Sequence, residues 1–317
     1  MRNPMTKCWF LLPLALGVSL AAEPEIRLGI IGVDTSHATE FARILNDGAA
    51  KDHVAGARVV AAYAGGSPDI AASRDRLDGF RRELQERWKI PFVQRIKDLC
   101  PLVDGLLLES VDGRTHLPQF REAAACGKPV FIDKPLASTL EDARSIARVA
   151  ADRSVPWFSA SSLRFGPVES MQSRDLKGAI VWGPGPLEEH HQLDLSWYGI
   201  HAVEALFTLM GPGAVEIART FAQDGDIVTG RWKDGRIGVV RILRPYGPLG
   251  AVVFLAGNHT KTEQNLDQGY APLLVEVVKF MKNRLPPVAN TETLEIFEFL
   301  DAAQKSRERG GAPVLIR

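Results

Sequence analysis

The chain has 317 residues, of which 45% are hydrophobic, and its 38 basic residues equal its 38 acidic residues in number. This length is enough for two ordinary domains, each with a sizeable core. Because there is no basic surplus, the composition argues against nucleic acid or an anionic membrane surface as the partner.

The start of the chain has the composition of a targeting segment. Arg2 and Lys7 form a positive region, and the apolar stretch 9–20 is too short to span a bilayer comfortably. Small residues follow and offer a cleavage site, with an uncleaved anchor as the alternative. We therefore predict a cleaved signal peptide over 1–22 and a secreted or periplasmic mature protein without a membrane span.

Two cysteines, Cys100 and Cys126, remain after this segment. Each lies near the end of an expected helix, and two cysteines do not make a disulfide framework. We expect both to be buried as small hydrophobic side chains.

The mature chain begins with a strand, a glycine turn and a helix. Ile26–Ile31 is a short, β-branched apolar run that is typical of a central parallel strand. Gly32 follows, and Thr35 or Ser36 can cap the next helix. This arrangement is where α/β proteins hold phosphate. The candidate cofactor-binding residues of this stretch are Gly29, Gly32, Asp34, Thr35 and Ser36.

The glycine pattern of this turn departs from a dinucleotide-binding fingerprint. The pattern G-x-G-x-x-G beginning at Gly32 requires glycine at the positions of Asp34 and His37. A carboxylate at Asp34 would repel a pyrophosphate unless its side chain turns away or pairs with a cation. Two interpretations stay open: a nucleotide site, or a strand–turn–helix in which Asp34 forms an Asx-turn.

Strands and helices alternate through the first half of the chain. The strand 58–64 lacks the acidic residue that would hold a ribose, and 65–67 after it is either a phosphate-binding turn or simply a long loop. Further strands are expected over 91–93, 104–109, 130–132 and 156–159. One helix is expected over 73–88, and another ends at Gly127. A third begins at a capping box made by Ser138 and Glu141 and continues to 153. This alternation predicts a doubly wound parallel sheet over 23–160.

Ligands of such a sheet collect at the carboxyl ends of its strands. Glu109, Asp112, His116 and Lys134 all follow expected strand ends. We therefore expect these four side chains to converge, although they are distant in sequence.

The pattern changes over 161–317. Helices are expected near 168–176 and over 198–210, 271–283 and 293–307, and strands over 179–182, 214–221, 226–232, 238–243 and 251–256. Strands in succession with helices at the sides predict an α+β domain with an open, largely antiparallel sheet.

The stretch 187–195 is expected to be extended and carries several polar side chains. On a strand, Glu188, His190, Gln192 and Asp194 would share one face, and with His201 nearby they form a potential metal set. A polar strand that faces solvent or a cleft is favoured, because the spacing matches no established metal motif. We assign no metal ligand.

Three stretches resemble the Gfo/Idh/MocA family, which is named for glucose–fructose oxidoreductase and inositol dehydrogenase. Residues 131–137, Phe-Ile-Asp-Lys-Pro-Leu-Ala, are similar to its Glu-Lys-Pro motif, with Asp133 in place of glutamate. Residues 196–204, Ser-Trp-Tyr-Gly-Ile-His-Ala-Val-Glu, are similar to its Asp-x-Gly-x-His-x-x-Asp motif, with Trp197 in place of the first aspartate. Residues 292–316 are similar to its last helix and strand.

The resemblance implies a nucleotide-binding Rossmann domain and a C-terminal sheet domain that often forms an oligomer interface. It also implies NAD or NADP as the cofactor and a sugar or polyol hydroxyl as the reacting group. By the same resemblance Lys134 and His201 are catalytic. A cation stabilises a developing alkoxide, and an imidazole has a pKa suited to moving the proton. Further candidates are Glu109, His116 and Lys134 for the cofactor, and Arg164, His190, Asp194 and Tyr198 for the substrate.

Two other functions remain open at this point. One is a non-redox enzyme acting on carbohydrate, such as a lyase, isomerase or hydrolase, with or without a metal. The other is a catalytically silent carbohydrate-binding protein. Under either enzyme interpretation, we predict that Lys134 and His201 face each other across a cleft between the domains.

Overall fold

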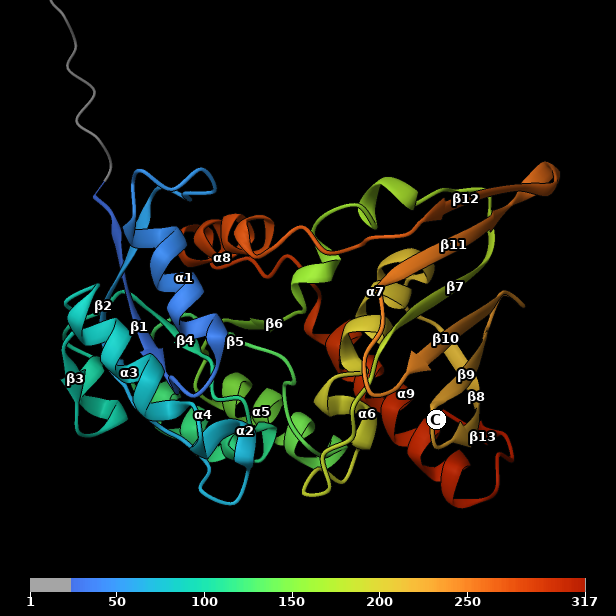
Figure 1. Ribbon diagram of the computed structural model, residues 1–317, viewed down its shortest axis with the longest axis horizontal. Coiled ribbons are helices and arrows are strands. Elements are labelled where there is room, and N and C mark those ends of the chain that lie inside the picture. Colours follow the sequence, from blue (N-terminus) through green and yellow to red (C-terminus); the bar gives the residue numbers. More distant parts are fainter. Residues whose placement is uncertain (1–23, 317) are drawn as a thin grey trace, which may run out of the picture.

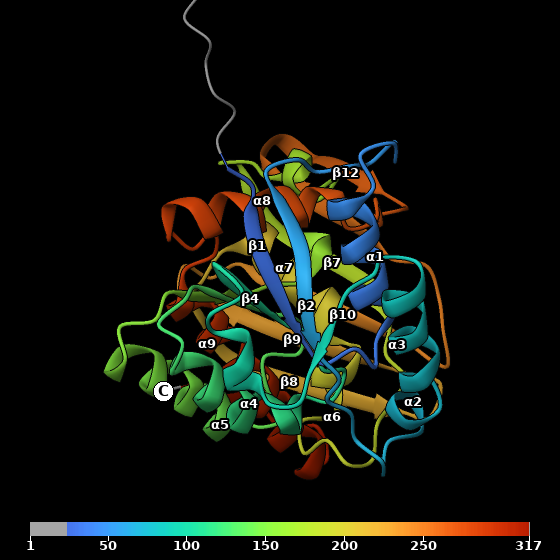
Figure 2. The same ribbon diagram turned by 90° about the vertical axis from the view of Figure 1, so that its left-hand side faces the viewer.

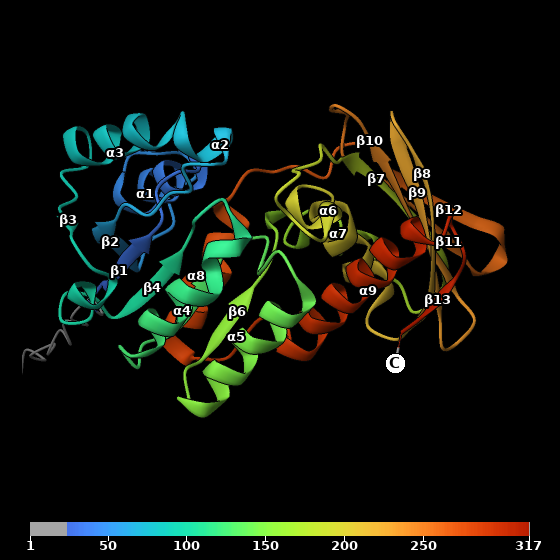
Figure 3. The ribbon, with the colours of Figure 1, turned by 90° about the horizontal axis from the view of Figure 1, so that it is seen from below.

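A computed structural model describes residues 24–316, which form two domains side by side (Figure 1). The predicted signal peptide over 1–22 lies outside these residues. Among the described residues, the helices are too short or too polar to cross a bilayer. Figure 3 shows the two sheets at opposite ends of the molecule, with helices between them.

The first domain contains a six-stranded parallel sheet in the order β3-β2-β1-β4-β5-β6. This is the doubly wound order of dinucleotide-binding folds, and it confirms the predicted sheet. Each strand is a short apolar run, and β4 is fully buried, as a central parallel strand requires. The strands are β1 (Ile26–Ile31), β2 (Ala57–Tyr63), β3 (Phe92–Val93), β4 (Gly105–Leu108), β5 (Val130–Ile132) and β6 (Trp157–Ser159).

Helices cover both faces of this sheet (Figure 2). They are α1 (Ser36–Asn46), α2 (Ala71–Arg74), α3 (Leu77–Glu86), α4 (His116–Ala124) and α5 (Leu140–Asp152). Thr35 caps α1, as predicted, but the cap of α5 is Thr139 and not Ser138. The prediction of a single helix over 73–88 is wrong, because this stretch is divided between α2 and α3. The hydroxyl of Ser73 is bonded to the loops after β1 and β2, and this ties α2 to the sheet edge.

The second domain contains a seven-stranded sheet in the order β12-β11-β7-β10-β9-β8-β13. Only β7 and β10 pair in parallel among its described strands, so the largely antiparallel sheet is confirmed. The strands are β7 (Leu176–Pro184), β8 (Ala214–Ala222), β9 (Gly225–Trp232), β10 (Ile237–Leu243), β11 (Gly250–Leu255), β12 (His259–Glu263) and β13 (Val314–Leu315).

Two local expectations in this domain are wrong. The helix near 168–176 is only a 3-10 turn at Glu169–Met171, after which β7 begins. The stretch 187–195 is not a strand but a loop that leads into the short helix α6 (Asp194–Trp197). Its side chains therefore do not alternate between two faces of a sheet.

The remaining helices connect the domains. α7 (Ile200–Met210) and α9 (Asn290–Glu308) pack on the second sheet, whereas α8 (Ala271–Asn283) returns to the first domain. Side chains of α8, among them Leu274 and Phe280, are buried in the same cluster as Leu28 of β1. Figure 1 shows α8 beside α1, far from the second sheet. The segment that leads into α8 consequently crosses the boundary between the domains.

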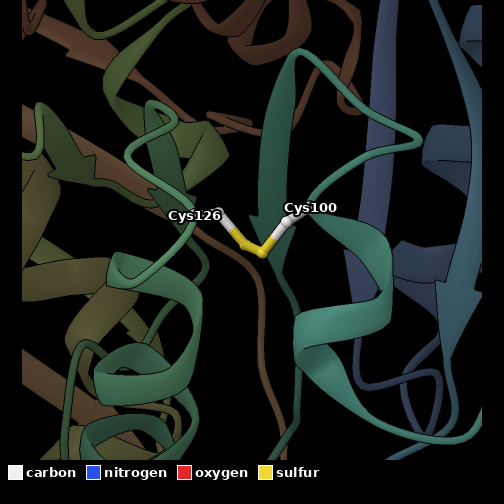
Figure 4. The surroundings of a disulfide bond; sticks show 2 residues. All are labelled: Cys100 and Cys126. Carbon is white, nitrogen blue, oxygen red and sulfur yellow. A yellow bond between two sulfur atoms is a disulfide. The ribbon is translucent and has the colours of Figure 1, made fainter.

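The two cysteines form a disulfide, contrary to our expectation of two free, buried thiols (Figure 4). Cys100 follows the 3-10 turn at Ile96–Leu99, and Cys126 follows α4. These two elements are packed together, which brings the cysteine Cα atoms within 5.0 Å across 26 positions of sequence. The pairing depends on this tertiary contact, which the sequence did not reveal.

Candidate active site

A cavity of about 500 Å³ lies between the two domains. Its walls combine the first turn of α1, the loop after β5, the start of α7 and the segment before α8. The polar and aromatic lining residues include Thr35, Ser36, His37, Arg76, Lys134, Tyr198, His201, Tyr246, Asp267 and Tyr270. The cavity thus lies at the carboxyl ends of the parallel strands, where ligands of doubly wound sheets bind.

Lys134 and His201 both line this cavity, from different domains. Tyr198 contacts each of them: its ring lies 5.7 Å from the Lys134 Nζ and 5.0 Å from the His201 ring. The Nδ1 atom of His201 is hydrogen-bonded to the Ser161 hydroxyl at 2.7 Å. Because this bond engages Nδ1, Nε2 is the nitrogen of His201 that remains for a ligand.

Burial sets the protonation of both groups. It lowers the pKa of His201 well below its ordinary value, and the positive charge of Lys134 acts in the same direction. Burial also lowers the pKa of Lys134, against the opposing effect of the Asp133 carboxylate. The His201 imidazole is therefore neutral near pH 7 and able to accept a proton.

The turn after β1 is shaped around a glycine. Gly32 has φ +88°, and a Cβ atom at this position would lie 2.1 Å from the Ser110 Oγ. No other residue type fits both the backbone conformation and this contact. The turn therefore presents the first residues of α1 to the cavity.

Asp34, at the second glycine position of the fingerprint, points away from the cavity. Its carboxylate is fully buried and accepts hydrogen bonds from the Ser73 hydroxyl at 2.6 Å and the Val111 backbone N–H at 3.1 Å. The partners lie on α2 and on the loop after β4, so these hydrogen bonds are not those of the Asx-turn that was one of the two open interpretations. Because the charge of Asp34 is directed into the protein, it does not oppose an anion at the start of α1.

The residues around α1 fit a phosphate-containing cofactor. Thr35, Ser36 and His37 line the cavity at the positive end of the helix dipole, and Arg76 also lines it. The loop after β2 offers no acidic group for a ribose at the expected position, and the Ser67 hydroxyl donates to Asp112. The site thus retains an anion-binding turn and lacks one customary ribose contact.

Three other expected cofactor residues have mainly structural surroundings. Gly29 lies within β1, where a Cβ would meet Val103 at 3.0 Å. His116 is buried with both ring nitrogens bonded to backbone carbonyls, those of Ser110 at 2.7 Å and Leu136 at 3.2 Å. Glu109 is fully buried and does not line the cavity.

Three expected substrate residues lie outside the cavity, and their positions correct our assignment. Arg164 is buried in ion pairs with Glu204 and Glu292. Asp194 is buried against Arg219, with an oxygen–nitrogen distance of 2.6 Å, and also pairs with Arg307. His190 is exposed and bonded to Glu188 at 2.6 Å. The structure therefore separates the members of the potential metal set over 188–194.

The structure adds one cavity residue that the sequence marked only as a departure from the fingerprint. The His37 ring packs against Tyr270 in a tilted arrangement, with ring centroids 4.6 Å apart, and its Nδ1 lies 2.5 Å from a carboxylate oxygen of Asp133. Burial raises the pKa of Asp133, but His37 and Lys134 together outweigh it and keep the pKa of this carboxyl below its usual range. In the sequence, the signal that could have brought His37 and Asp133 together is that each follows the end of a parallel strand.

Comparison with known proteins agrees with this architecture. Residues 26–160 match the Gfo/Idh/MocA family model, described as an oxidoreductase family with an NAD-binding Rossmann fold. A curated protein of Salmonella typhimurium, "Putative oxidoreductase YceM", is 30% identical over 109 residues, which is 34% of this chain and 34% of that protein. The match thus spans about a third of that relative.

Solved structures share the fold of both domains. The myo-inositol dehydrogenase of Lactobacillus casei, solved with NAD(H) and myo-inositol, superposes with a TM-score of 0.70 at 17% identity, covering 93% of this chain and 97% of its own. The myo-inositol 2-dehydrogenase of Lactobacillus plantarum gives a TM-score of 0.73 at 13% identity, covering 93% and 100%. At these identities the likeness shows the fold. The family match itself covers residues 26–160, which are the first domain.

Proposed function

We propose that this protein is a Gfo/Idh/MocA oxidoreductase that uses NAD or NADP to oxidise or reduce a sugar or polyol hydroxyl. The observation that carries the proposal is the meeting of Lys134, Tyr198 and His201 in one cavity with the first turn of α1. The substrate class is in keeping with the myo-inositol bound by the Lactobacillus casei neighbour.

The cavity residues divide the reaction between them. When bound, a nicotinamide ring supplies the acceptor for the hydride that leaves the carbinol carbon. His201, which burial keeps neutral, accepts the hydroxyl proton at Nε2 in the tautomer whose Nδ1–H donates to the Ser161 hydroxyl. The Lys134 ammonium stabilises the negative charge that develops on the oxygen. Tyr198, which contacts both side chains, is positioned to orient the sugar ring.

The first turn of α1 would hold the cofactor phosphates. Thr35 and Ser36 supply hydroxyl groups and backbone N–H groups there, and Arg76 supplies a positive charge. Glycine at position 32 lets the chain turn sharply enough to leave this helix end open.

The test is a titration of the purified mature protein with NADH and NADPH, followed by nicotinamide fluorescence, and then a turnover screen with polyols and sugars. We expect saturable nucleotide binding. His201→Gln should keep that binding and lower turnover by about 10²–10⁴-fold, because it removes a general base. Lys134→Met tests the lysine in the same way. Its matched control is Lys97→Met, since Lys97 is exposed and lies outside the cavity.

The titration also separates the other candidate functions. Absence of nucleotide binding at millimolar concentration would refute the redox proposal. Turnover of a carbohydrate without nucleotide would then favour the non-redox enzyme. Sugar binding that Lys134→Met and His201→Gln leave unchanged would favour the silent binding protein.

We further propose that the protein works outside the cytoplasm. The Cys100–Cys126 disulfide supports this location, because disulfides persist in oxidising compartments and are rare in the cytosol. The targeting composition of 1–22 supports it too. Mass spectrometry of the exported protein should find a cleaved N-terminus and no free thiol after denaturation. An uncleaved chain with two alkylated cysteines beyond residue 22 would refute the proposal.

We also propose a homo-oligomer formed through the second sheet. Its strands carry exposed apolar side chains, namely Phe221, Ile227, Ile237 and Phe254. Light scattering after size-exclusion chromatography tests this, and a monomer of about 35 kDa across the micromolar range would refute it.

A further inference from the structure

Three metal-ligating side chains meet beneath the cavity, at the carboxyl ends of neighbouring strands. His37 opens α1 after β1, Glu109 follows β4, and Asp133 follows β5. One ligand atom of each lies within 4.8 Å of the other two. Their exposed fractions are 8%, 0% and 3%, so the three groups are almost entirely shielded from water.

Glu109 is the unusual member of this cluster. Both of its carboxylate oxygens are buried and have no hydrogen-bond partner among residues 24–316. A buried carboxyl without a partner costs several kcal/mol unless something satisfies it. A proton shared with Asp133 or a cation bound by both carboxyl groups could satisfy it, since ligand atoms of the two residues lie within 4.8 Å of each other.

The side chains beside Glu109 indicate which kind of ion could bind there. The Nδ1 atom of His37 is hydrogen-bonded to Asp133 at 2.5 Å, so a metal ion would take the place of the proton between this imidazole nitrogen and this carboxylate. With Glu109 they form a set of one nitrogen and two carboxylate ligands. Zinc and other first-row transition metals accept such mixed sets, whereas Mg²⁺ and Ca²⁺ prefer oxygen ligands alone.

We propose that His37, Glu109 and Asp133 bind a divalent first-row transition metal such as Zn²⁺ or Mn²⁺. Three protein ligands leave a coordination position open, which is the arrangement of catalytic sites and not of structural ones. His37 also lines the cavity that holds Lys134 and His201, so the open position is near bound substrate. The proposal is independent of nucleotide binding, and each has its own measurement.

The test begins with the purified mature protein after dialysis against a chelator. We expect Co²⁺ to bind with one equivalent and a visible absorption band, Zn²⁺ to displace it, and the midpoint of thermal unfolding to rise with metal concentration. Glu109→Gln and Asp133→Asn should each weaken binding about 100-fold or more, and His37→Gln should do the same.

The matched control is His190→Gln. His190 also lies beside two carboxylates, Glu188 at 2.6 Å and Asp69 at 3.9 Å, but it is exposed and is not part of the His37, Glu109 and Asp133 cluster. It should leave the metal affinity unchanged. If His190→Gln abolishes binding while Glu109→Gln retains it, the assignment is wrong.

The wild-type protein alone can also refute the site. No stoichiometric binding and no thermal stabilisation would mean that Glu109 and Asp133 share a proton and hold no metal. This outcome does not depend on whether the variants fold. Nucleotide fluorescence is recorded separately, so loss of one function does not conceal the other.

Discussion

Restoring the glycine fingerprint should damage this protein. Asp34→Gly places glycine at the second position of the pattern, where the fingerprint requires it. In this fold, however, the Asp34 carboxylate is the acceptor for the Ser73 hydroxyl and the Val111 N–H, and it is fully buried. We expect the variant to be less stable and to bind nucleotide no better.

The magnitude follows from the two hydrogen bonds. A hydrogen bond to a charged group contributes about 1.5–3 kcal/mol, and water that enters the vacated space recovers part of the loss. Glycine adds about 0.5–1 kcal/mol through the entropy of the unfolded chain. We therefore expect Asp34→Gly to lower the free energy of unfolding by about 3 kcal/mol. Asp34→Asn should lose only about 1 kcal/mol, because an amide can still bond to both partners.

The expected nucleotide affinity distinguishes this account from electrostatic repulsion. A carboxylate 4 Å from a phosphate at an effective dielectric constant of 20 would cost about 4 kcal/mol, which is more than 100-fold in Kd. If Asp34 faced the cofactor, its removal would tighten NADH binding by such a factor. Because the carboxylate points into the protein, we expect a change of about twofold or less.

Urea denaturation followed by circular dichroism measures the first quantity, and nicotinamide fluorescence measures the second. Asp69→Gly is the control, because its side chain is 47% exposed and forms a surface ion pair with Arg114. That change should cost about 1 kcal/mol or less. An Asp34→Gly protein as stable as the wild type, or one with much tighter NADH binding, would refute the reasoning.

Three further outcomes are expected. Cys100→Ser removes the disulfide that joins residues 26 positions apart and should lower the free energy of unfolding by about 3.5 kcal/mol, measured in urea without reductant. An unchanged midpoint of urea unfolding would contradict this. Arg164→Met leaves the buried Glu204 carboxylate without its ion-pair partner and should lower the free energy of unfolding by about 3–5 kcal/mol with KM unchanged. A stable variant with a raised KM would instead indicate that Arg164 contacts the substrate. Hydroxyl oxidation should fall only well below pH 6.5, where the neutral His201 base is lost, and an acid limb at or above pH 6.5 would contradict this. Ser161→Ala should lower kcat and move that limb, with KM little affected, and an unmoved limb would exclude its positioning role.

Most strands could be predicted because their signal is local. Within the predicted run 104–109, residues 105–108 are apolar and buried, as are residues 130–132, which is what central parallel strands require. The alternation of strands and helices then predicts a doubly wound parallel sheet, and the structure supplies its strand order. This reasoning also placed Lys134 at a carboxyl end of the sheet, where the cavity lies.

The failures share a dependence on distant partners. Asp194 looks like one polar position in an alternating stretch, but its carboxylate is paired with Arg219, which lies 25 positions later. The break between α2 and α3 depends on Ser73, whose hydroxyl bonds to Asp34 across 39 positions. The disulfide depends on packing between two separate helical elements. A local pattern does not encode these pairings, since each is decided by the assembled fold.

The two departures from the glycine fingerprint have different physical meanings. Asp34 and His37 are both too large for the pattern, and from sequence alone each weakens the case for a nucleotide. In the structure the Asp34 side chain points inward and forms hydrogen bonds to α2 and to the loop after β4. His37 instead brings an imidazole to the cavity wall, beside Asp133. The first departure keeps a carboxylate out of the turn after β1, and the second places an imidazole beside that turn. Side-chain direction, and not residue identity, therefore decides whether such a departure removes a function or creates one.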